Sequence, residues 1–422
     1  MSETLALHGG TPVRTDPWPP MYPGGMSFDE EEKRAAIEVI EARSPFRYYG
    51  VNLLNKVDQL ERAYAGYVGT RFALAVGSGS TALTVALAAL GVGPGTEVIL
   101  PALMWISDVN SVIHLRGIPV LAEIDDTLTL DPDDLQRRIT PRTKAIVATH
   151  MVGSAANIPA ILEVADPYGI PVLEDCSQAA GAEIAGRKVG SIGHIGATSL
   201  QYNKNFTTGE GGMVTTSDEG LFRRSICFHD QGFERNLQGI STPQDGAFET
   251  YGIGTRMDEL RGAIGLVQVK KFPDIIRRMR NRQIHLRRVL DGIPKIRLRR
   301  LIDEGGDSGA YLIWFHEDKE TAERFAEAIR AEGIPASPPP GGIHQYRHMS
   351  NLLKNVPVTT AGCPWTCPFN QGSPMEYHAG MLPRSNDLLD RARMISLPPQ
   401  MTDQDEEDLI RAFKKVAGVL LK

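Results

Sequence analysis

Lys204 has the sequence context of a lysine that uses its amine for chemistry. It follows an expected strand and precedes the glycine-rich turn NFTTGEGG at residues 205–212. A lysine that forms a Schiff base must reach a carbonyl group from a fixed point, in surroundings that lower its pKa. Glycines just after it let the backbone pass close to a ligand. Because most lysines are solvated surface residues, Lys204 becomes informative only together with other residues.

Residues 77–81 (GSGST) form a candidate anion site that includes Gly79, Ser80 and Thr81. An expected strand ends here, and a helical stretch, ALTVALAAL, follows. Unpaired backbone N–H groups and the macrodipole at a helix start favour an anion. An ordinary Ser/Thr helix cap explains the same residues. The segment is neither a GxGxxG loop nor a Walker A loop, since no Gly-Lys-Ser/Thr follows.

Asp175 and Trp105 each stand at or just past the end of an expected strand. A carboxylate at that place can hold a protonated pyridine nitrogen and keep the ring cationic, so that the ring acts as an electron sink. Capping of the next helix is an equal alternative for Asp175. An aromatic face at Trp105 can stack on a ring, although on its own this tryptophan is better explained as a core residue.

Alternating strands and helices between about residues 70 and 215 predict an α/β fold with a mainly parallel sheet covered by helices on both faces. Ligands in such sheets bind at the carboxyl ends of the strands. The expected strands are Phe72–Val76, Glu97–Pro101, Pro119–Glu123, Ala145–His150, Pro171–Glu174 and Ala197–Tyr202. The expected helices between them are 80–91, 106–115, 132–139 and 157–168, preceded by an irregular arm at 1–25 and helices at 28–43 and 52–67.

The pattern changes after a long helical region at 257–290, which we expect to be broken near Pro273. A strand at Ala310–Phe315 and helices at 319–332 and 403–421 indicate a smaller α+β domain. We therefore predict a large domain at 1–280, including the arm, and a small C-terminal domain at 281–422. The segment 340–384 is either a lid over the active site or an irregular surface excursion of the small domain.

Composition excludes several classes of protein. The 422 residues carry a net charge of −6, which argues against nucleic acid as the main partner. No segment resembles a secretory signal or a membrane span, and four cysteines make no disulfide scaffold, so a cytoplasmic protein is expected. Cys363 and Cys367 lack a second Cys or His pair beside them, so two free thiols are expected rather than a zinc site, and no metal is predicted.

The order of these features decides between the alternatives. A phosphate turn, an aromatic residue, a strand-end Asp and then a Lys about 30 residues later is the chain order of fold-type-I pyridoxal-phosphate enzymes. The sequence resembles the DegT/StrS-type aminotransferases over nearly its whole length. The segments that carry the resemblance include YVGTRFALAVGSGSTAL, VGPGTEVILPALMW, EDCSQAAGAE, KNFTTGEGG, TRMDELRGAIG and RMISLPPQMTDQD.

The resemblance implies a fold-type-I enzyme with a mainly parallel, seven-stranded sheet in its large domain and pyridoxal 5′-phosphate as cofactor. It implies that Lys204 carries the cofactor as a Schiff base and that Asp175 bonds the pyridine nitrogen. The remaining cofactor contacts that it implies are Gly79, Ser80 and Thr81 at the helix start, Ser199 on the phosphate, Trp105 on the ring and Gln178 near the 3-oxygen. It also implies a homodimer whose sites are shared between subunits.

Two departures from the family pattern concern the partner subunit and the substrate. Gly254 stands where the family usually has an Asn that reaches the partner's phosphate. Gln201-Tyr202-Asn203 precedes the lysine where sugar-nucleotide enzymes usually have a His-Pro type sequence. Thr255, a backbone N–H or water can replace the first contact, whereas the second departure shifts weight away from nucleotide-sugar substrates.

The resemblance is strongest to the glutamine:scyllo-inosose aminotransferase branch. It implies transfer of an amino group from glutamine or glutamate to a cyclic ketone, in aminocyclitol or antibiotic biosynthesis. The alternatives are a keto-sugar or nucleotide-sugar aminotransferase and an enzyme like 3-amino-5-hydroxybenzoate synthase. A regulatory protein on the same fold is a further alternative, disfavoured because Asp175, Lys204, Ser80 and Ser199 are all present.

Overall fold

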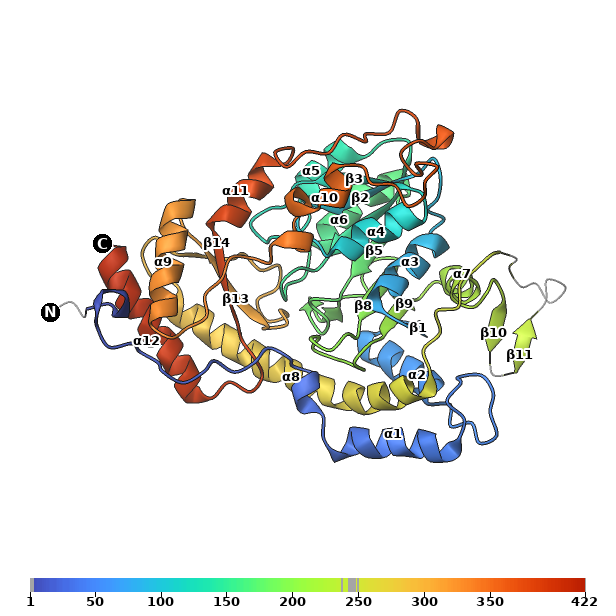
Figure 1. Cartoon of the computed structure of the whole chain (residues 1–422), viewed down its shortest axis with the longest axis horizontal. Helices are drawn as coiled ribbons and strands as arrows, with labels where there is room; N and C mark the ends of the chain where they lie inside the picture. The colour runs from blue at the N-terminus through green and yellow to red at the C-terminus, as the bar shows by residue number, and fades with distance from the viewer. Residues whose placement is uncertain (1–3, 237, 242–247, 249, 422) are drawn as a thin grey trace.

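The structure is a computed structural model that describes residues 4–236, 238–241, 248 and 250–421. A seven-stranded sheet in the order β1-β9-β8-β5-β4-β2-β3 forms its centre (Figure 1). The strands β8, β5, β4, β2 and β3 are mutually parallel, and β9 pairs antiparallel with both β1 and β8. The strands are β1 (Phe72–Val76), β2 (Glu97–Pro101), β3 (Ile118–Ala122), β4 (Thr143–Thr149), β5 (Val172–Asp175), β8 (Ile195–Ser199) and β9 (Gly212–Thr216). The predicted α/β fold is confirmed.

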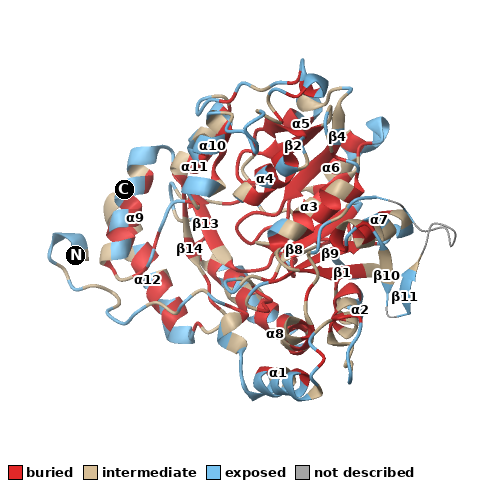
Figure 2. Cartoon of the chain, turned by 45° about the vertical axis from the view of Figure 1, so that its right-hand side comes forward, coloured by how far each residue is buried: buried red, intermediate tan, exposed pale blue. Residues whose placement is uncertain are grey.

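The sheet is buried on both faces, which explains its continuous apolar strands (Figure 2). In β2, Val98 and Leu100 enter one core cluster and Ile99 enters another on the opposite face. The helices over the first face are α3 (Gly79–Ala89), α4 (Ile106–His114) and α7 (Glu219–His229). Those over the second are α5 (Pro132–Arg138), α6 (Ile158–Ala165) and, toward β1, α2 (Lys56–Val68).

A single long helix, α8 (Glu259–Leu290), connects the two domains (Figure 1). The predicted break at Pro273 is wrong, because the proline lies inside the uninterrupted helix. A proline removes one helical hydrogen bond, but Phe272, Ile275 and Ile276 beside it are buried in a core cluster. This packing holds the helix together across the missing bond.

The small domain packs two helices, α9 (Lys319–Ala331) and α12 (Asp403–Leu420), around an aromatic core. Its sheet is antiparallel and has the order β12 (Arg297–Leu298), β13 (Tyr311–Phe315), β14 (Ala392–Ser396). The arm belongs here as well, since Leu5 is buried in the same cluster as Trp314. The predicted division at residue 280 therefore falls inside α8, and the chain crosses between the two domains more than once.

The segment between α9 and β14 lies largely on the large domain, over α4, β2 and β3 (Figure 1). Tyr346 N–H donates to Ala102 O at 3.1 Å, and Tyr377 Oη donates to Pro119 O at 2.6 Å. Its short elements are η5 (Gly342–His344), η6 (Tyr346–His348), α10 (Ser350–Leu353), η7 (Pro368–Asn370) and α11 (Pro383–Arg391). All four cysteines, including Cys363 and Cys367, are free thiols.

Among the other elements, η1 (Ala6–His8) packs against α9 of the small domain. Those at the edges of the large domain are η2 (Gly25–Ser27), α1 (Glu30–Ala42), η3 (Asp166–Tyr168), β6 (Glu183–Ile184), β7 (Arg187–Lys188), β10 (Glu234–Asn236) and β11 (Gly239–Ser241). Within the described residues, no helix has the length and apolar character needed to cross a membrane.

Arg299 fixes the small domain to the large one. Its guanidinium is 2% exposed and donates to the carbonyls of Thr127, Met151 and Val152 at 2.5–3.0 Å. Burial lowers the pKa of Arg299 to about 10, so it is still charged at neutral pH. The three carbonyls come from loops that follow β3 and β4 at the carboxyl edge of the large sheet, so this contact joins the small domain to that edge.

Arg299→Met should lower the free energy of unfolding by about 3 kcal/mol, because it leaves buried carbonyls without donors. Chemical denaturation measures this loss. Arg300→Met is the matched control: Arg300 pairs with Asp125 and Asp126 at a half-exposed position, so its loss should cost at most about 1 kcal/mol. Equal losses in the two variants would contradict the anchoring role of Arg299.

Candidate active site

A cleft of about 530 Å³ opens at the carboxyl edge of the sheet, where a ligand site is expected. Side chains from the β1–α3, β2–α4, β5 and β8–β9 connections converge there, and the small domain closes one side. The predicted residues that line the cleft are Gly79, Ser80, Trp105, Asp175, Gln178, Ser199 and Lys204. Thr81 is the one predicted site residue that does not line it.

The first turn of α3 forms the anion end of the cleft. Ser78 caps the helix: its Oγ accepts from Thr81 N at 3.2 Å, and Thr81 Oγ1 accepts from Ser78 N at 2.9 Å. Thr81 is thereby committed to the cap. The N–H groups of Gly79 and Ser80 stand in the open first turn, where the macrodipole favours a bound anion.

Hydroxyl groups surround this helix end. Ser80 Oγ and Ser107 Oγ are 2.6 Å apart, and Ser177 Oγ accepts from Ser199 N at 3.0 Å. Ser107 and Ser177 line the cleft but were not predicted. Ser177, two residues after Asp175, could have been found from its place in the same strand-end turn. Ser107 gives no such signal, because only the fold brings α4 beside α3.

Gly79 allows this end of the cleft to form. A Cβ built on Gly79 would lie 2.4 Å from Ser199 Cβ. Any side chain here would therefore push the start of α3 away from the end of β8. The N–H groups of the helix start and the Ser199 hydroxyl must face the same anion. They can do so only because residue 79 has no side chain.

Asp175 ends β5 and is 2% exposed. Its Oδ1 accepts from Ser177 N at 3.0 Å, and its backbone carbonyl accepts from His150 N at 3.0 Å. The carboxylate is thus oriented toward the cleft by its own turn and by the neighbouring strand. It suits a cationic N–H on a ligand ring.

Lys204 lies in the β8–β9 connection, half-buried, and lines the cleft. Burial lowers the pKa of its ammonium, while the charge of Asp175 opposes the shift. The amine is therefore neutral in a larger fraction of molecules than a surface lysine, as a nucleophile or proton carrier requires. Gly24 N donates to Lys204 O at 3.0 Å, so the N-terminal arm lies directly against this loop.

Trp105 forms one wall of the cleft and is 37% exposed, so it is not a core residue. The ring of His344 meets it edge to face, with centroids 4.7 Å apart. Burial lowers the pKa of His344, which keeps this imidazole neutral. Pro340 and His344 are the part of the segment 340–384 that lines the cleft, and Tyr311 of the small domain lines it as well.

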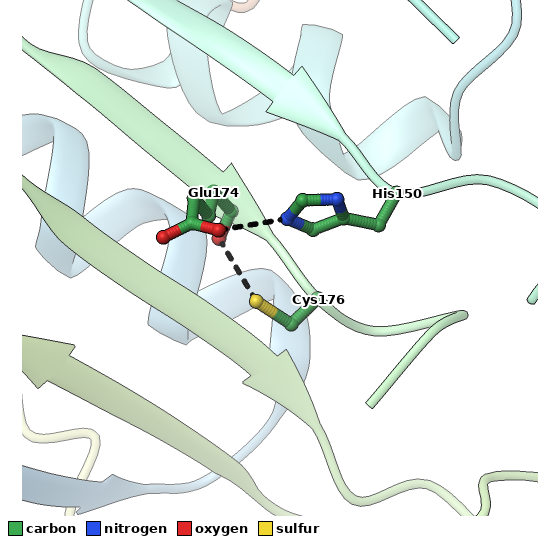
Figure 3. A group of neighbouring side chains, drawn as sticks. All are labelled: His150, Glu174 and Cys176. Carbon is green, nitrogen blue, oxygen red and sulfur yellow. Dashed lines mark hydrogen bonds and ion pairs between the residues drawn. The ribbon is translucent and has the colours of Figure 1, made fainter. Parts of the chain in front are cut away.

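A second buried polar group, His150, Glu174 and Cys176, lies behind the strand end (Figure 3). His150 Nδ1 accepts from Ala156 N at 2.8 Å, so its ring proton is on Nε2, which is 3.0 Å from Glu174 Oε2. Glu174 Oε1 accepts two backbone N–H groups, at 2.7 and 2.8 Å. Burial raises the pKa of Cys176, which keeps the thiol protonated. These hydrogen bonds hold the end of β5 in place beneath Asp175, and we call this group a clamp.

Gly254, where the family pattern has Asn, lies beside an amide. A Cβ on Gly254 would be 3.0 Å from Gln231 Nε2. Thr255 is already engaged, with its N and Oγ1 donating to His229 O at 3.0 and 3.4 Å. The Arg256 guanidinium lies 3.5 Å from the same built Cβ, so Gln231 and Arg256 are side-chain donors next to the altered position.

Together these groups define a class of protein: an α/β fold whose cleft holds a lysine of lowered pKa, the open start of a helix, an aromatic wall and a strand-end carboxylate. The sequence matches the DegT/DnrJ/EryC1/StrS aminotransferase family over residues 29–414. The chain belongs to this family and is an aminotransferase.

Individual relatives agree with that assignment. The chain is 34% identical to an L-glutamine:2-deoxy-scyllo-inosose aminotransferase of Streptoalloteichus tenebrarius, over 81% of this chain and 82% of the relative. It is 32% identical to the spore coat polysaccharide biosynthesis protein SpsC of Bacillus subtilis, over 86% and 89%. The crystal structure of 3-amino-5-hydroxybenzoic acid synthase superposes with a TM-score of 0.77 at 25% identity, covering 96% of this chain and all of that one.

Gly79→Ala should weaken binding of pyridoxal phosphate at least about tenfold, a loss of about 1.4 kcal/mol, because the methyl group separates α3 from Ser199. Titration of the apo-protein, followed by absorbance, measures the affinity. Gly93→Ala is the matched control, since nothing lies within 4 Å of a Cβ there. Unchanged affinity in the Gly79 variant would mean that the anion does not bind at the start of α3.

Proposed function

We propose that this cleft binds pyridoxal phosphate and transfers an amino group from glutamine or glutamate to the ketone of an uncharged cyclic polyol, such as a scyllo-inosose. The charge of the cleft is the observation that supports the proposed acceptor. Among its described lining residues, Lys204 is the only Lys or Arg. A nucleotide diphosphate is expected to need several cationic side chains, so a neutral acceptor suits this cleft better.

The donor set fits the cofactor at four points. The first turn of α3 and the Ser199 hydroxyl suit a phosphate, Trp105 suits one face of an aromatic ring, and Asp175 suits a protonated ring nitrogen. Lys204 supplies the amine for a carbonyl group. When bound, pyridoxal phosphate supplies an electron sink conjugated to the amino nitrogen of the substrate.

The residues of the chain then divide the remaining work. Lys204, with its lowered pKa, accepts a proton from the substrate carbon as general base and returns one as general acid. Asp175 holds the proton of the ring nitrogen by charge. Trp105 and His344 orient the reacting plane from one side and exclude water there. Gln178, which also lines the cleft, is positioned to contact a polar ring substituent.

The donor and acceptor are supported by the name of the relative aligned over four fifths of the chain, which takes glutamine and 2-deoxy-scyllo-inosose. The name SpsC, a polysaccharide biosynthesis protein, supports the alternative of a keto-sugar acceptor. The 3-amino-5-hydroxybenzoic acid synthase supports a second alternative, a different cyclic ketone. The three candidates, a scyllo-inosose, a keto-sugar and a different cyclic ketone, can each be tested separately as the acceptor.

Glutamine added to the purified holoenzyme should convert the absorption of its pyridoxal form, bound to Lys204, into that of the pyridoxamine form. Scyllo-inosose should then restore the band of the pyridoxal form, whereas a nucleotide-linked keto-sugar should not. Stopped-flow absorbance measures both half-reactions. If the nucleotide-linked sugar alone restores the band, the proposed acceptor is wrong although the aminotransferase assignment stands.

Lys204→Ala should slow both half-reactions at least about 100-fold, since it removes the general base. The matched control is Lys144→Ala, which changes an exposed lysine and should leave both rates unchanged. A Lys204→Ala enzyme that still turns over at the wild-type rate would contradict its role.

A homodimer that shares its sites is the second part of the proposal. Val51, Tyr49 and Tyr251 are 86%, 67% and 95% exposed in the single chain. Their two loops meet where the Arg256 guanidinium lies 5.5 Å from the Phe46 ring centroid. Thr255 O accepts from Gly77 N at 2.7 Å, so this apolar surface adjoins the start of α3. A partner chain that covers it would reach the anion end of the cleft.

Tyr251→Asp should raise the dimer dissociation constant at least about tenfold, because it places a charge in an apolar contact. Sedimentation velocity measures the change. Tyr168→Asp is the control, at a tyrosine of η3 that is 57% exposed. Wild-type protein that sediments as a single chain would contradict the dimer.

A further inference from the structure

A second carboxyl lies beside Asp175, and it has no role in the chemistry described above. Asp108, in the first turn of α4, is completely buried. Its Oδ2 accepts from Thr149 Oγ1 at 3.0 Å. Its Oδ1 is buried without a hydrogen-bond donor in the described part of the chain. An unsatisfied carboxylate oxygen in such a place is costly.

The fold places the Asp108 side chain next to Asp175. Thr149 of β4 is the register partner of Asp175 on β5, and the side chains of Asp108 and Asp175 are within hydrogen-bonding reach. Two carboxylates offer each other no hydrogen. A proton on Asp108 Oδ1 converts the contact into an O–H···O hydrogen bond, while Oδ2 keeps its bond from Thr149.

The surroundings favour the protonated form. Burial, followed by the charge of Asp175, raises the pKa of Asp108 well above its ordinary value, and the Thr149 hydroxyl opposes this only partly. Of the titratable groups around the pair, Lys204 and Cys176 face Asp175. The N-terminal turn of α4 favours an anion, but burial beside a second carboxylate outweighs it.

We propose that Asp108 keeps its carboxyl proton and donates it in a hydrogen bond to Asp175, so that the pair presents one shared negative charge to the cleft. Asp108 is thus a positioning residue that acts through Asp175. It holds one Asp175 oxygen and leaves the other for the ligand. The effect of this positioning on catalysis depends on the proposed pyridoxal phosphate.

Stability as a function of pH tests the proton without any cofactor. A carboxyl whose pKa is raised in the folded state destabilises the fold as pH rises above its unfolded value of about 3.9. Asp108→Asn cannot lose a proton, so its unfolding midpoint should rise relative to wild type between about pH 4 and 7. An infrared band of a protonated carboxyl at neutral pH should also disappear in this variant.

Asp134→Asn is the matched control, at another buried aspartate. Burial raises the pKa of Asp134, but a backbone donor from Glu123 and two arginines outweigh it, so the net shift is downward. The sign is therefore opposite: Asp134→Asn should be less stable than wild type by a nearly constant amount between about pH 5 and 7, and this deficit should shrink as the pH falls below the unfolded value of about 3.9. If both variants shift in the same direction, the proton on Asp108 is refuted.

Activity measurements test whether Asp175 needs a hydrogen-bond donor at residue 108 or a charged group there. Asp108→Asn keeps an N–H donor toward Asp175 and should retain glutamine turnover within about threefold at neutral pH. Asp108→Ala removes the donor and should lower kcat at least about tenfold with a smaller change in KM. It should also change the pH at which the absorption of the bound cofactor titrates. An Asn variant as impaired as the Ala variant, or an Ala variant equal to wild type, would overturn the role of Asp108. Neither result would alter the proton assignment, which the stability test decides.

Discussion

The approach of Gly79 to Ser199 is the constraint on which the site depends. A helix start and a strand end are held so close that a single methyl group would lie 2.4 Å from the serine side chain. The same contact fixes where β8 ends, and hence where the loop that carries Lys204 begins. The antiparallel strand β9 follows that loop and pairs with both β8 and β1. Anion site and lysine are therefore built as one rigid unit.

Electrostatics in this unit relies on few charges in a buried place. Asp175 and Lys204 carry opposite charges in the same cleft, and the charge of Asp175 raises the pKa of Lys204 against the larger effect of burial. A single carboxylate would be a strong and poorly oriented acceptor. Asp108 and the backbone N–H of Ser177 both restrain the Asp175 carboxylate. Its negative charge is therefore held in a fixed orientation. The clamp of His150 and Glu174 serves the same end from behind, because it prevents the strand end from shifting.

The sequence predicts the cofactor half of the site because that half is local. Each strand is followed within a few residues by its functional side chain, so pattern and position coincide at Ser80, Trp105, Asp175 and Lys204. Contacts between distant segments were not predictable: Tyr311 and Ser107 reach the cleft only through packing. The supposed break at Pro273 failed for a related reason, since the burial that keeps α8 continuous is tertiary. Asp108 gives no signal beyond its place in the expected helix 106–115, because its burial beside Asp175 is tertiary.

The two halves of the cleft differ in origin, and this difference bears on substrate choice. The cofactor half comes from turns of one continuous sheet. The opposite wall, where the proposed acceptor would lie, is lined by three separate pieces: Met21 of the arm, Tyr311 of the small domain and His344 of the segment 340–384. Because Arg299 joins small domain to large through three carbonyls, the distance between these halves is fixed by the fold. Side chains of these three pieces can therefore differ in size or charge without moving Lys204, and under the proposed function they are the residues that would select the ketone.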